Sequence, residues 1–140
     1  MAPLVSTIEI ARPPKDVFEY ATDPLRFSEW QRDVVRVRML DGARFATTRR
    51  FTGAERTLTQ EITHNDPPYR WGARGVDGPV RAHATITIEP LDDGDRSRVT
   101  FTLDFEGHGL GVPLIPLVRR QARAGVPVSY RNLQRILEES

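Results

Sequence analysis

The spacing of apolar residues changes several times along this chain, and the changes allow few architectures. Residues 7–10 alternate apolar and polar side chains, as a half-buried strand does. Helical spacing begins after Pro13-Pro14, because proline is tolerated in the first helical turn. It stops at Asp23-Pro24, since the residue before a proline avoids the helical region. Residues 25–30 predict a second short helical turn, and only strand patterns follow until about residue 110.

Six further strands are predicted between residues 33 and 105, and each has one apolar face. Turn dipeptides such as Asp41-Gly42 and Asp77-Gly78 separate them. Clean alternation is typical of an antiparallel sheet with one buried face. The residues predicted to share the buried face are Val35, Val37 and Met39; Phe45, Thr47, Arg49 and Phe51; Leu58, Gln60 and Ile62; Tyr69, Trp71 and Ala73; Val80, Ala82, Ala84, Ile86 and Ile88; and Val99, Phe101, Leu103 and Phe105.

Helical spacing returns at about residue 112 and continues to Leu137. Apolar residues recur there at intervals of three and four, and the arginines lie mostly off that stripe. Gly125-Val126-Pro127 falls inside this helix, where a proline removes a hydrogen bond and clashes with the preceding turn. We therefore expect a kink, or two helical segments that meet near Val126.

Composition narrows the class of protein. A chain of 140 residues predicts one domain over residues 1–140. The absence of cysteine favours a cytoplasmic location, and no apolar run is long enough for integral membrane association. Since the net charge is only +1, we expect no nucleic-acid partner. The sequence leaves the oligomeric state open between a monomer and a homodimer.

The order of these elements resembles the START-like, helix-grip superfamily (SRPBCC) and, within it, the polyketide cyclase/dehydrase-like branch. The resemblance covers nearly the whole chain and rests on four segments: Ile8–Phe18, Asp23–Trp30, Gly42–Phe45 and Val99–Gly107. It implies an α+β fold in which a curved, seven-stranded antiparallel sheet wraps around a long C-terminal helix, with two short helices between the first and second strands. In that family a deep, mainly apolar cavity lies between the sheet and the helix.

Small residues on the inward face favour a ligand cavity, because small side chains that face one another leave volume unfilled. The alternative is that Phe101, Phe105, Trp71, Trp30 and Phe45 simply fill the space. The residues predicted to line a ligand site are Trp30, Arg49, Gln60, Trp71, Ala84, Phe101, Leu103, Val118, Ala122, Val126 and Tyr130.

Two polar residues fall on the inward face, and such groups orient a ligand in an apolar pocket. Gln60 lies between Leu58 and Ile62, and Arg49 lies between Thr47 and Phe51. Burying either without a partner is costly, so both are candidates to bind a carbonyl, phenol or carboxylate. A bulge would instead turn them to water, and Arg50 would then be the inward arginine. Tyr130 either reaches the cavity or packs at its rim.

No cofactor and no dedicated metal site is expected, because there is no cysteine and no histidine pair has ligand spacing. His108, in the glycine-rich segment before the last helix, would need a hydrogen-bonding partner to act as a base. The residues identify no catalytic group. Three hypotheses for the function follow.

The first is binding of a small hydrophobic molecule, such as a lipid, polyketide or aromatic metabolite. The resemblance also permits the second, a polyketide cyclase/aromatase- or dehydratase-like enzyme that acts in the cavity. The third is a protein-interaction role for the arginine-rich outer face of the last helix.

Overall fold

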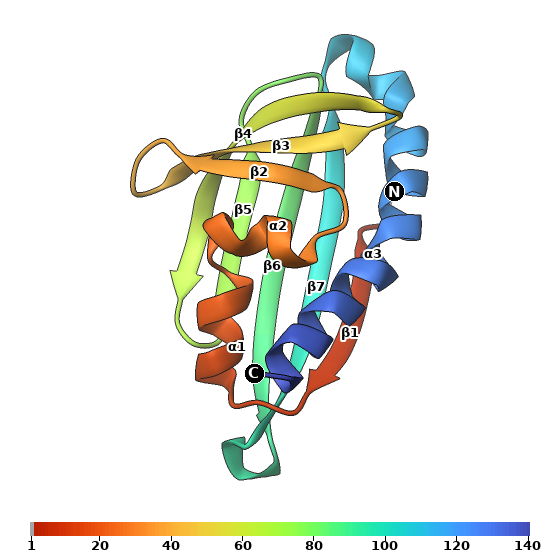
Figure 1. Cartoon of the computed structure of the whole chain (residues 1–140). Coiled ribbons are helices and arrows are strands. Elements are labelled where there is room, and N and C mark those ends of the chain that lie inside the picture. Colours follow the sequence, from red (N-terminus) through yellow and green to blue (C-terminus); the bar gives the residue numbers. More distant parts are fainter. Residues whose placement is uncertain (1) are drawn as a thin grey trace.

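A seven-stranded antiparallel sheet forms the body of the protein, of which the computed structural model describes residues 2–140 (Figure 1). The strands are β1 (Leu4–Ile10), β2 (Val34–Met39), β3 (Arg44–Phe51), β4 (Ala54–Asp66), β5 (Arg70–Gly75), β6 (Val80–Leu91) and β7 (Arg96–Gly107). Their order across the sheet is β1-β7-β6-β5-β4-β3-β2. Strands β2 to β7 therefore pair in chain order, whereas β1 pairs with β7 at the far edge.

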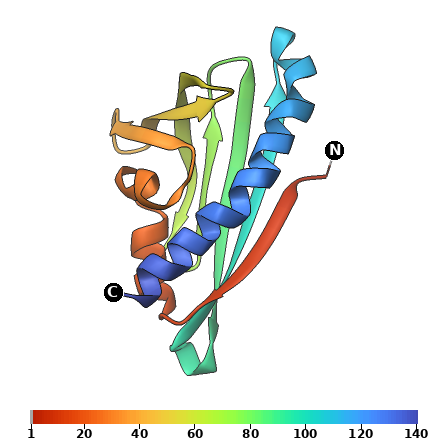
Figure 2. The same cartoon turned by 45° about the vertical axis from the view of Figure 1, so that its right-hand side comes forward.

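Except for a single turn between β6 and β7 at one end, the helices lie on one face of the curved sheet, and the longest runs diagonally across it (Figures 1 and 2). They are α1 (Pro14–Ala21), η1 (Pro24–Arg26), α2 (Phe27–Trp30), η2 (Asp92–Gly94), η3 (Gly109–Leu114) and α3 (Ile115–Glu138). The predicted order of a strand, two short helices, six strands and a long helix is confirmed. Within residues 2–140, no helix is long and apolar enough to cross a membrane.

The chain changes direction at Pro13-Pro14 and again at Asp23-Pro24, and each change has a local cause. Pro14 occupies the first turn of α1, where its missing N–H would have no helical partner. The Asp23 side chain accepts a hydrogen bond from the Leu25 amide at 3.1 Å and so caps η1. These two changes of direction place α1 and α2 against the same face of the sheet as α3.

The pattern prediction for β2 is wrong at its first residue. The register shifts between Val34 and Arg36, which marks a bulge opposite β3. A bulge adds one residue to a strand, so the side chains before it change faces. Val34 is therefore buried in the core, whereas Val35 is only half-buried. Val37 and Met39 keep the predicted face and pack against the core.

Helix α3 is continuous through Pro127, so of the two expectations, a kink or two segments that meet near Val126, the second is wrong. Pro127 and Arg123 both lie on the exposed side of the helix. Water can therefore bind the Arg123 carbonyl, which the proline leaves without a helical partner. Arg119 also differs from expectation, because it is buried and donates a hydrogen bond to the Ala2 carbonyl at 2.8 Å.

Polar side chains fasten α3 to the rest of the fold. Four of them bind backbone groups: Ser129 binds the amide of Arg32, Asn132 the carbonyl of Trp30, Gln121 that of Arg50 and Gln134 that of Glu9. Gly125 allows the connection before β2 to approach closely, since a β-carbon there would lie 3.3 Å from Asp33 Oδ2.

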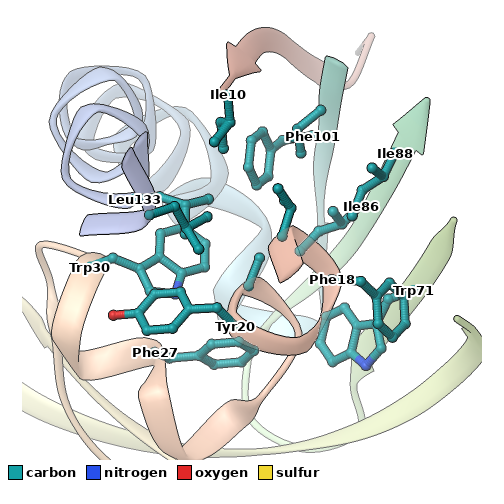
Figure 3. Close-up of a cluster of buried hydrophobic side chains, with 14 of the residues drawn as sticks. Ile10, Phe18, Tyr20, Phe27, Trp30, Trp71, Ile86, Ile88, Phe101 and Leu133 are labelled. Atoms are coloured by element: carbon teal, nitrogen blue, oxygen red, sulfur yellow. The ribbon is translucent and has the colours of Figure 1, made fainter. Parts of the chain in front are cut away.

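The hydrophobic core gathers beneath α1, α2 and the C-terminal half of α3 (Figure 3). Side chains from all three helices meet the inner face of the sheet there. The fully or nearly fully buried members are Ile10, Val17, Phe18, Tyr20, Ala21, Phe27, Trp30, Val34, Phe45, Trp71, Ala73, Ile86, Ile88, Val99, Phe101, Leu133 and Leu137. We call this region the closed half of the inner face.

Candidate functional site

The inner face of the sheet changes character along its strands. On β6, Ile86 and Ile88 are 5% and 2% exposed and belong to the closed half. Farther along the same face, Ala82 and Ala84 are only half-buried. The residues that share this half-buried character are Leu58 and Gln60 on β4, Ala82 and Ala84 on β6, Leu103 and Phe105 on β7, and Val118 and Ala122 on α3. We call this region the open half.

Three residues predicted to line a ligand site pack in the closed half instead. Phe101 stacks on Tyr130 with ring centroids 3.7 Å apart, and Trp30 lies 6.2 Å from Phe101. Trp71 lies 6.4 Å from Phe45, and both rings contact Phe27 edge-on. In this half of the molecule the aromatic residues fill the interior, as the alternative interpretation expected.

The open half brings together five of the predicted residues: Gln60, Ala84, Leu103, Val118 and Ala122. Ala84 pairs directly with Leu103 across β6 and β7. Val118 and Ala122 lie on the same side of α3 as the buried Ser129. Because these residues retain solvent contact, the open half presents an accessible apolar surface.

Of the two neighbouring arginines that could face inward, Arg49 does so and Arg50 does not. Arg50 is exposed and lies 3.8 Å from Glu55 on the outside. Arg49 donates a hydrogen bond from Nη2 to Gln31 Oε1 at 2.8 Å. Burial lowers the pKa of Arg49 below its ordinary value, while the nearby charge of Asp33 and the Tyr130 hydroxyl oppose that shift. The guanidinium nevertheless stays charged, because arginine does not lose its proton in proteins.

The guanidinium of Arg49 has hydrogen-bonding capacity left over. Among residues 2–140, Gln31 is the one acceptor of its N–H groups, and none of its unpaired nitrogens is fully shielded from solvent. Arg49 therefore places a permanent positive charge at the boundary between the closed and open halves, where a ligand oxygen can reach it.

Gln60 faces inward as predicted and is held by Thr47 on the neighbouring strand. The hydroxyl of Thr47, a residue that is 2% exposed, donates to Gln60 Oε1 at 2.8 Å. The Gln60 side-chain NH₂ group has no acceptor among residues 2–140. It is consequently free to donate a hydrogen bond into the open half.

Tyr130 and Val126 lie beside a hollow of about 240 Å³ between α3 and β1. Its other lining residues are Ser6, Ile8, Pro127, Arg131 and Gln134. Burial raises the pKa of Tyr130 above its ordinary value, and Arg49 opposes that rise. The Tyr130 phenol is thus neutral at physiological pH.

The hollow beside Tyr130 is smaller than most small-molecule sites, which occupy about 300–1,000 Å³. A second hollow, of about 190 Å³, lies on the outside near Arg12 and Tyr20. Neither matches the deep cavity that the resemblance implied.

Sequence reasoning did not find Gln31 and Asp33, the polar neighbours of Arg49. Both lie in the connection between α2 and β2, where no periodic pattern indicates which way a side chain points. The only local signal was a polar segment, Gln31-Arg32-Asp33, directly after the buried Trp30.

The histidines lie away from this site. His83 and His108 both approach Glu106: Nε2 of His83 lies 3.1 Å from Oε2, and Nε2 of His108 lies 3.2 Å from Oε1. His64 bonds the neighbouring Thr63 hydroxyl on an exposed stretch of β4. Residues 2–140 contain no cluster of three or more His, Cys, Asp or Glu side chains arranged to hold a metal ion.

A curved antiparallel sheet that grips a long C-terminal helix, with short helices after the first strand, defines the START-like fold. Among solved structures, the Zhui aromatase/cyclase from Streptomyces sp. R1128 is similar, with a TM-score of 0.84 and 15% identity over 97% of this chain and 93% of that one. A START superfamily protein from Mycobacterium smegmatis has a TM-score of 0.82 and 14% identity over 99% of both chains. A conserved protein from Geobacillus kaustophilus has a TM-score of 0.77 and 19% identity over 97% and 95%.

The family model described as "Polyketide cyclase / dehydrase and lipid transport" matches residues 1–138. The chain belongs to this family. Among curated proteins, none matches the sequence significantly. Family membership supports a role in binding a hydrophobic molecule or in cyclase chemistry, and the structural neighbours support the fold.

Proposed function

We propose that this protein binds a small hydrophobic molecule with an oxygen-bearing polar end along the open half of the inner face. The observation that carries the proposal is Arg49, a permanently charged, half-buried side chain with unused N–H groups. Holding such a charge partly out of water with one hydrogen-bonding partner is costly, so its retention points to a ligand that completes its hydrogen bonds.

The apolar part of the ligand would lie on the open half. Leu58, Leu103 and Phe105 offer partly exposed apolar surface, and Ala84 and Ala122 leave room above it. Removing such surface from water is favourable by about 25 cal/mol per Å², so covering it with a ligand provides the main driving force. The NH₂ group of Gln60 offers a second polar contact.

The polar end of the ligand would bind at Arg49. A guanidinium presents planar, paired N–H donors that suit a carboxylate, and single donors that suit a carbonyl or phenol oxygen. A lipid with an acidic head, an aromatic metabolite and a polyketide chain all combine such an end with an apolar body.

Arg49→Met tests this proposal, since methionine keeps the apolar stem and removes the charge. We expect carboxylate- or ketone-bearing aromatic and fatty compounds to raise the melting temperature of the wild-type protein. The substitution should weaken their binding roughly tenfold or more, the usual value of a charged hydrogen bond, and leave wholly apolar analogues unaffected.

Arg50→Met is the matched control, because Arg50 is exposed on the opposite side of the strand. Gln60→Leu should likewise weaken polar-headed ligands more than apolar ones. If no such compound shifts the melting temperature, or if Arg49→Met and Arg50→Met behave alike, the proposal fails.

A second candidate is a cyclase- or dehydratase-like reaction at the same place. Tyr130, a neutral phenol, lies close enough to Arg49 for each to shift the other's pKa. A cation and a phenol together can polarise a carbonyl and supply a proton to its oxygen. Liquid chromatography with mass spectrometry of a bound poly-ketone separates the two candidates, since a carrier returns it unchanged, a dehydratase releases water from it and a cyclase returns an isomer with a different retention time. Tyr130→Phe should abolish that change and preserve binding.

A further inference from the structure

Exposed apolar residues gather at one end of the molecule, between the end of β7 and the first turn of α3. Leu110 is 89% exposed, Val112 58%, Leu117 45% and Leu114 38%. The other large apolar residues that are exposed within residues 2–140 stand singly on separate elements, at Val5, Leu25, Leu40 and Tyr69. Single exposed apolar residues are ordinary, whereas a cluster marks an interaction surface. We call Leu110, Val112, Leu114 and Leu117 the apolar tip.

The backbone that carries the apolar tip is firmly packed against the rest of the fold. A loose segment is therefore not the reason that the side chains of the tip are exposed. The His108 amide donates to the Pro79 carbonyl at 2.8 Å. Gly111 is buried against the same proline, and a β-carbon there would collide with the Pro79 carbonyl. At Gly107 a β-carbon would lie 2.7 Å from the Cα of Val112. The fold therefore holds these apolar side chains outward.

Positive charge follows the apolar tip along α3. Residues 115–137 contain five arginines and no acidic residue. Arg120 and Arg123 are exposed one to two turns after the tip, and neither has a carboxylate within 4.0 Å among residues 2–140. The acidic residues nearest the tip are already engaged, since Asp104 approaches Arg119 and Glu106 approaches two histidines.

We propose that the apolar tip, together with Arg120 and Arg123, docks onto the surface of an anionic lipid bilayer. Leucine and valine side chains on a protruding turn can enter the boundary between headgroups and acyl chains, while adjacent arginines bind anionic headgroups. Neither the hollow beside Tyr130 nor the one near Arg12 and Tyr20 includes a residue of the tip. The docking surface is independent of the ligand proposed above.

Vesicle co-sedimentation of the full chain tests this inference. The probes are vesicles of phosphatidylcholine alone and vesicles that also contain phosphatidylglycerol. We expect the wild-type protein to bind the anionic vesicles, to bind neutral ones much less, and to dissociate as salt rises. Leu110→Ser should lower the partition coefficient roughly tenfold, and Arg120→Gln with Arg123→Gln should lower it by about fivefold per arginine.

Two control variants test whether a loss of vesicle binding is specific to the apolar tip and its two arginines. Leu25→Ser removes another exposed leucine, 57% exposed in η1, and Arg38→Gln removes an exposed arginine of β2. Both should bind vesicles as the wild type does. Equal melting temperatures would show that the variants fold, which is expected because Leu110 contributes almost nothing to the core.

Three outcomes would overturn the inference. The first is no binding of the wild type to anionic vesicles, and the second is equal binding by Leu110→Ser and the wild type. The third is a dimer in size-exclusion chromatography that Leu110→Ser converts to a monomer, because the tip would then be covered by a second copy of this chain.

Discussion

The closed and open halves of the inner face are built on the same strands and the same helix, yet only the closed half is sealed. Strand β6 contributes Ile86 and Ile88 to the closed half and Ala82 and Ala84 to the open half. In the closed half, α1 and α2 add aromatic side chains beside α3, as Figure 3 shows for Phe18, Phe27 and Trp30. In the open half, neither α1 nor α2 covers the sheet, and α3 runs along it (Figure 1). Side-chain size and the covering helices therefore decide where the interior stays accessible.

Truncating one aromatic residue in each half should give the largest difference in the free energy of unfolding between the two halves. Trp30→Ala removes a ring that is 2% exposed and packs against Phe101 and Tyr130. Its loss should lower the free energy of unfolding by about 3–5 kcal/mol. Phe105→Ala removes a half-buried ring of the open half and should cost only about 1 kcal/mol. Urea unfolding of both variants measures the difference, and similar losses would contradict the division into two halves.

Ala73 and Ala84 provide a sharper comparison, because they lie directly opposite each other on β5 and β6. Ala73 is 2% exposed and Ala84 is half-buried. Ala73→Leu should overpack the closed half and cost about 1–3 kcal/mol. Ala84→Leu should change stability by about 0.5 kcal/mol or less, since its side chain has space. It should also reduce ligand-induced thermal shifts. A strongly destabilised Ala84→Leu would show that the open half is already full.

Tyr20 should make the closed half sensitive to alkaline pH. Burial, reinforced by a 2.7 Å hydrogen bond to Glu29, raises the pKa of Tyr20 to about 12. The folded state favours the neutral phenol, so this stability is complete below the ordinary tyrosine pKa and is lost as pH rises through the folded value. Tyr20→Phe should therefore lose less stability than the wild type on alkaline titration, whereas Tyr69→Phe, an exposed control, should follow the wild type.

Glu106, near the apolar tip, should make the smallest contribution to stability, and that contribution should be lost at acidic pH. A hydrogen bond from His83 lowers the pKa of Glu106, and the nearby His108 adds to that shift. The folded state favours the carboxylate, so its contribution is present above the ordinary glutamate pKa and is lost as pH falls through the lowered value. Thermal unfolding should show a difference between Glu106→Gln and the wild type at neutral pH that disappears in acid. An equal response from Glu89→Gln, another exposed glutamate of the sheet, would refute this assignment.

Local signals predicted most of the fold. Alternation located every strand, and prolines located the ends of α1 and the start of η1, because both effects act within a few residues. The β2 bulge and the buried Arg119 escaped prediction, since each depends on a distant partner. The bulge is defined against β3, and Arg119 is buried because it binds the carbonyl of Ala2.

The candidate site was predictable only in part. Alternation alone turned Arg49 and Gln60 inward, and the structure agrees. Their partners were not predictable, because Gln31 lies in a connection and Thr47 approaches Gln60 only through strand pairing. The division into closed and open halves depends on where α2 places Phe27 and Trp30, which no pattern along the strands reveals.

The pairing of β1 has a consequence for how the protein folds during synthesis. Leu4 pairs with Leu103, and Arg12 donates to the Leu137 carbonyl and the Ser140 hydroxyl. Strand β1 therefore leaves the ribosome before β7, its pairing partner, has been synthesised. Strands β2 to β7 can pair in order as they emerge, whereas the edge at β7 stays unpaired until β1 returns. We expect nascent chains that lack residues 96–140 to be sensitive to proteases throughout β1.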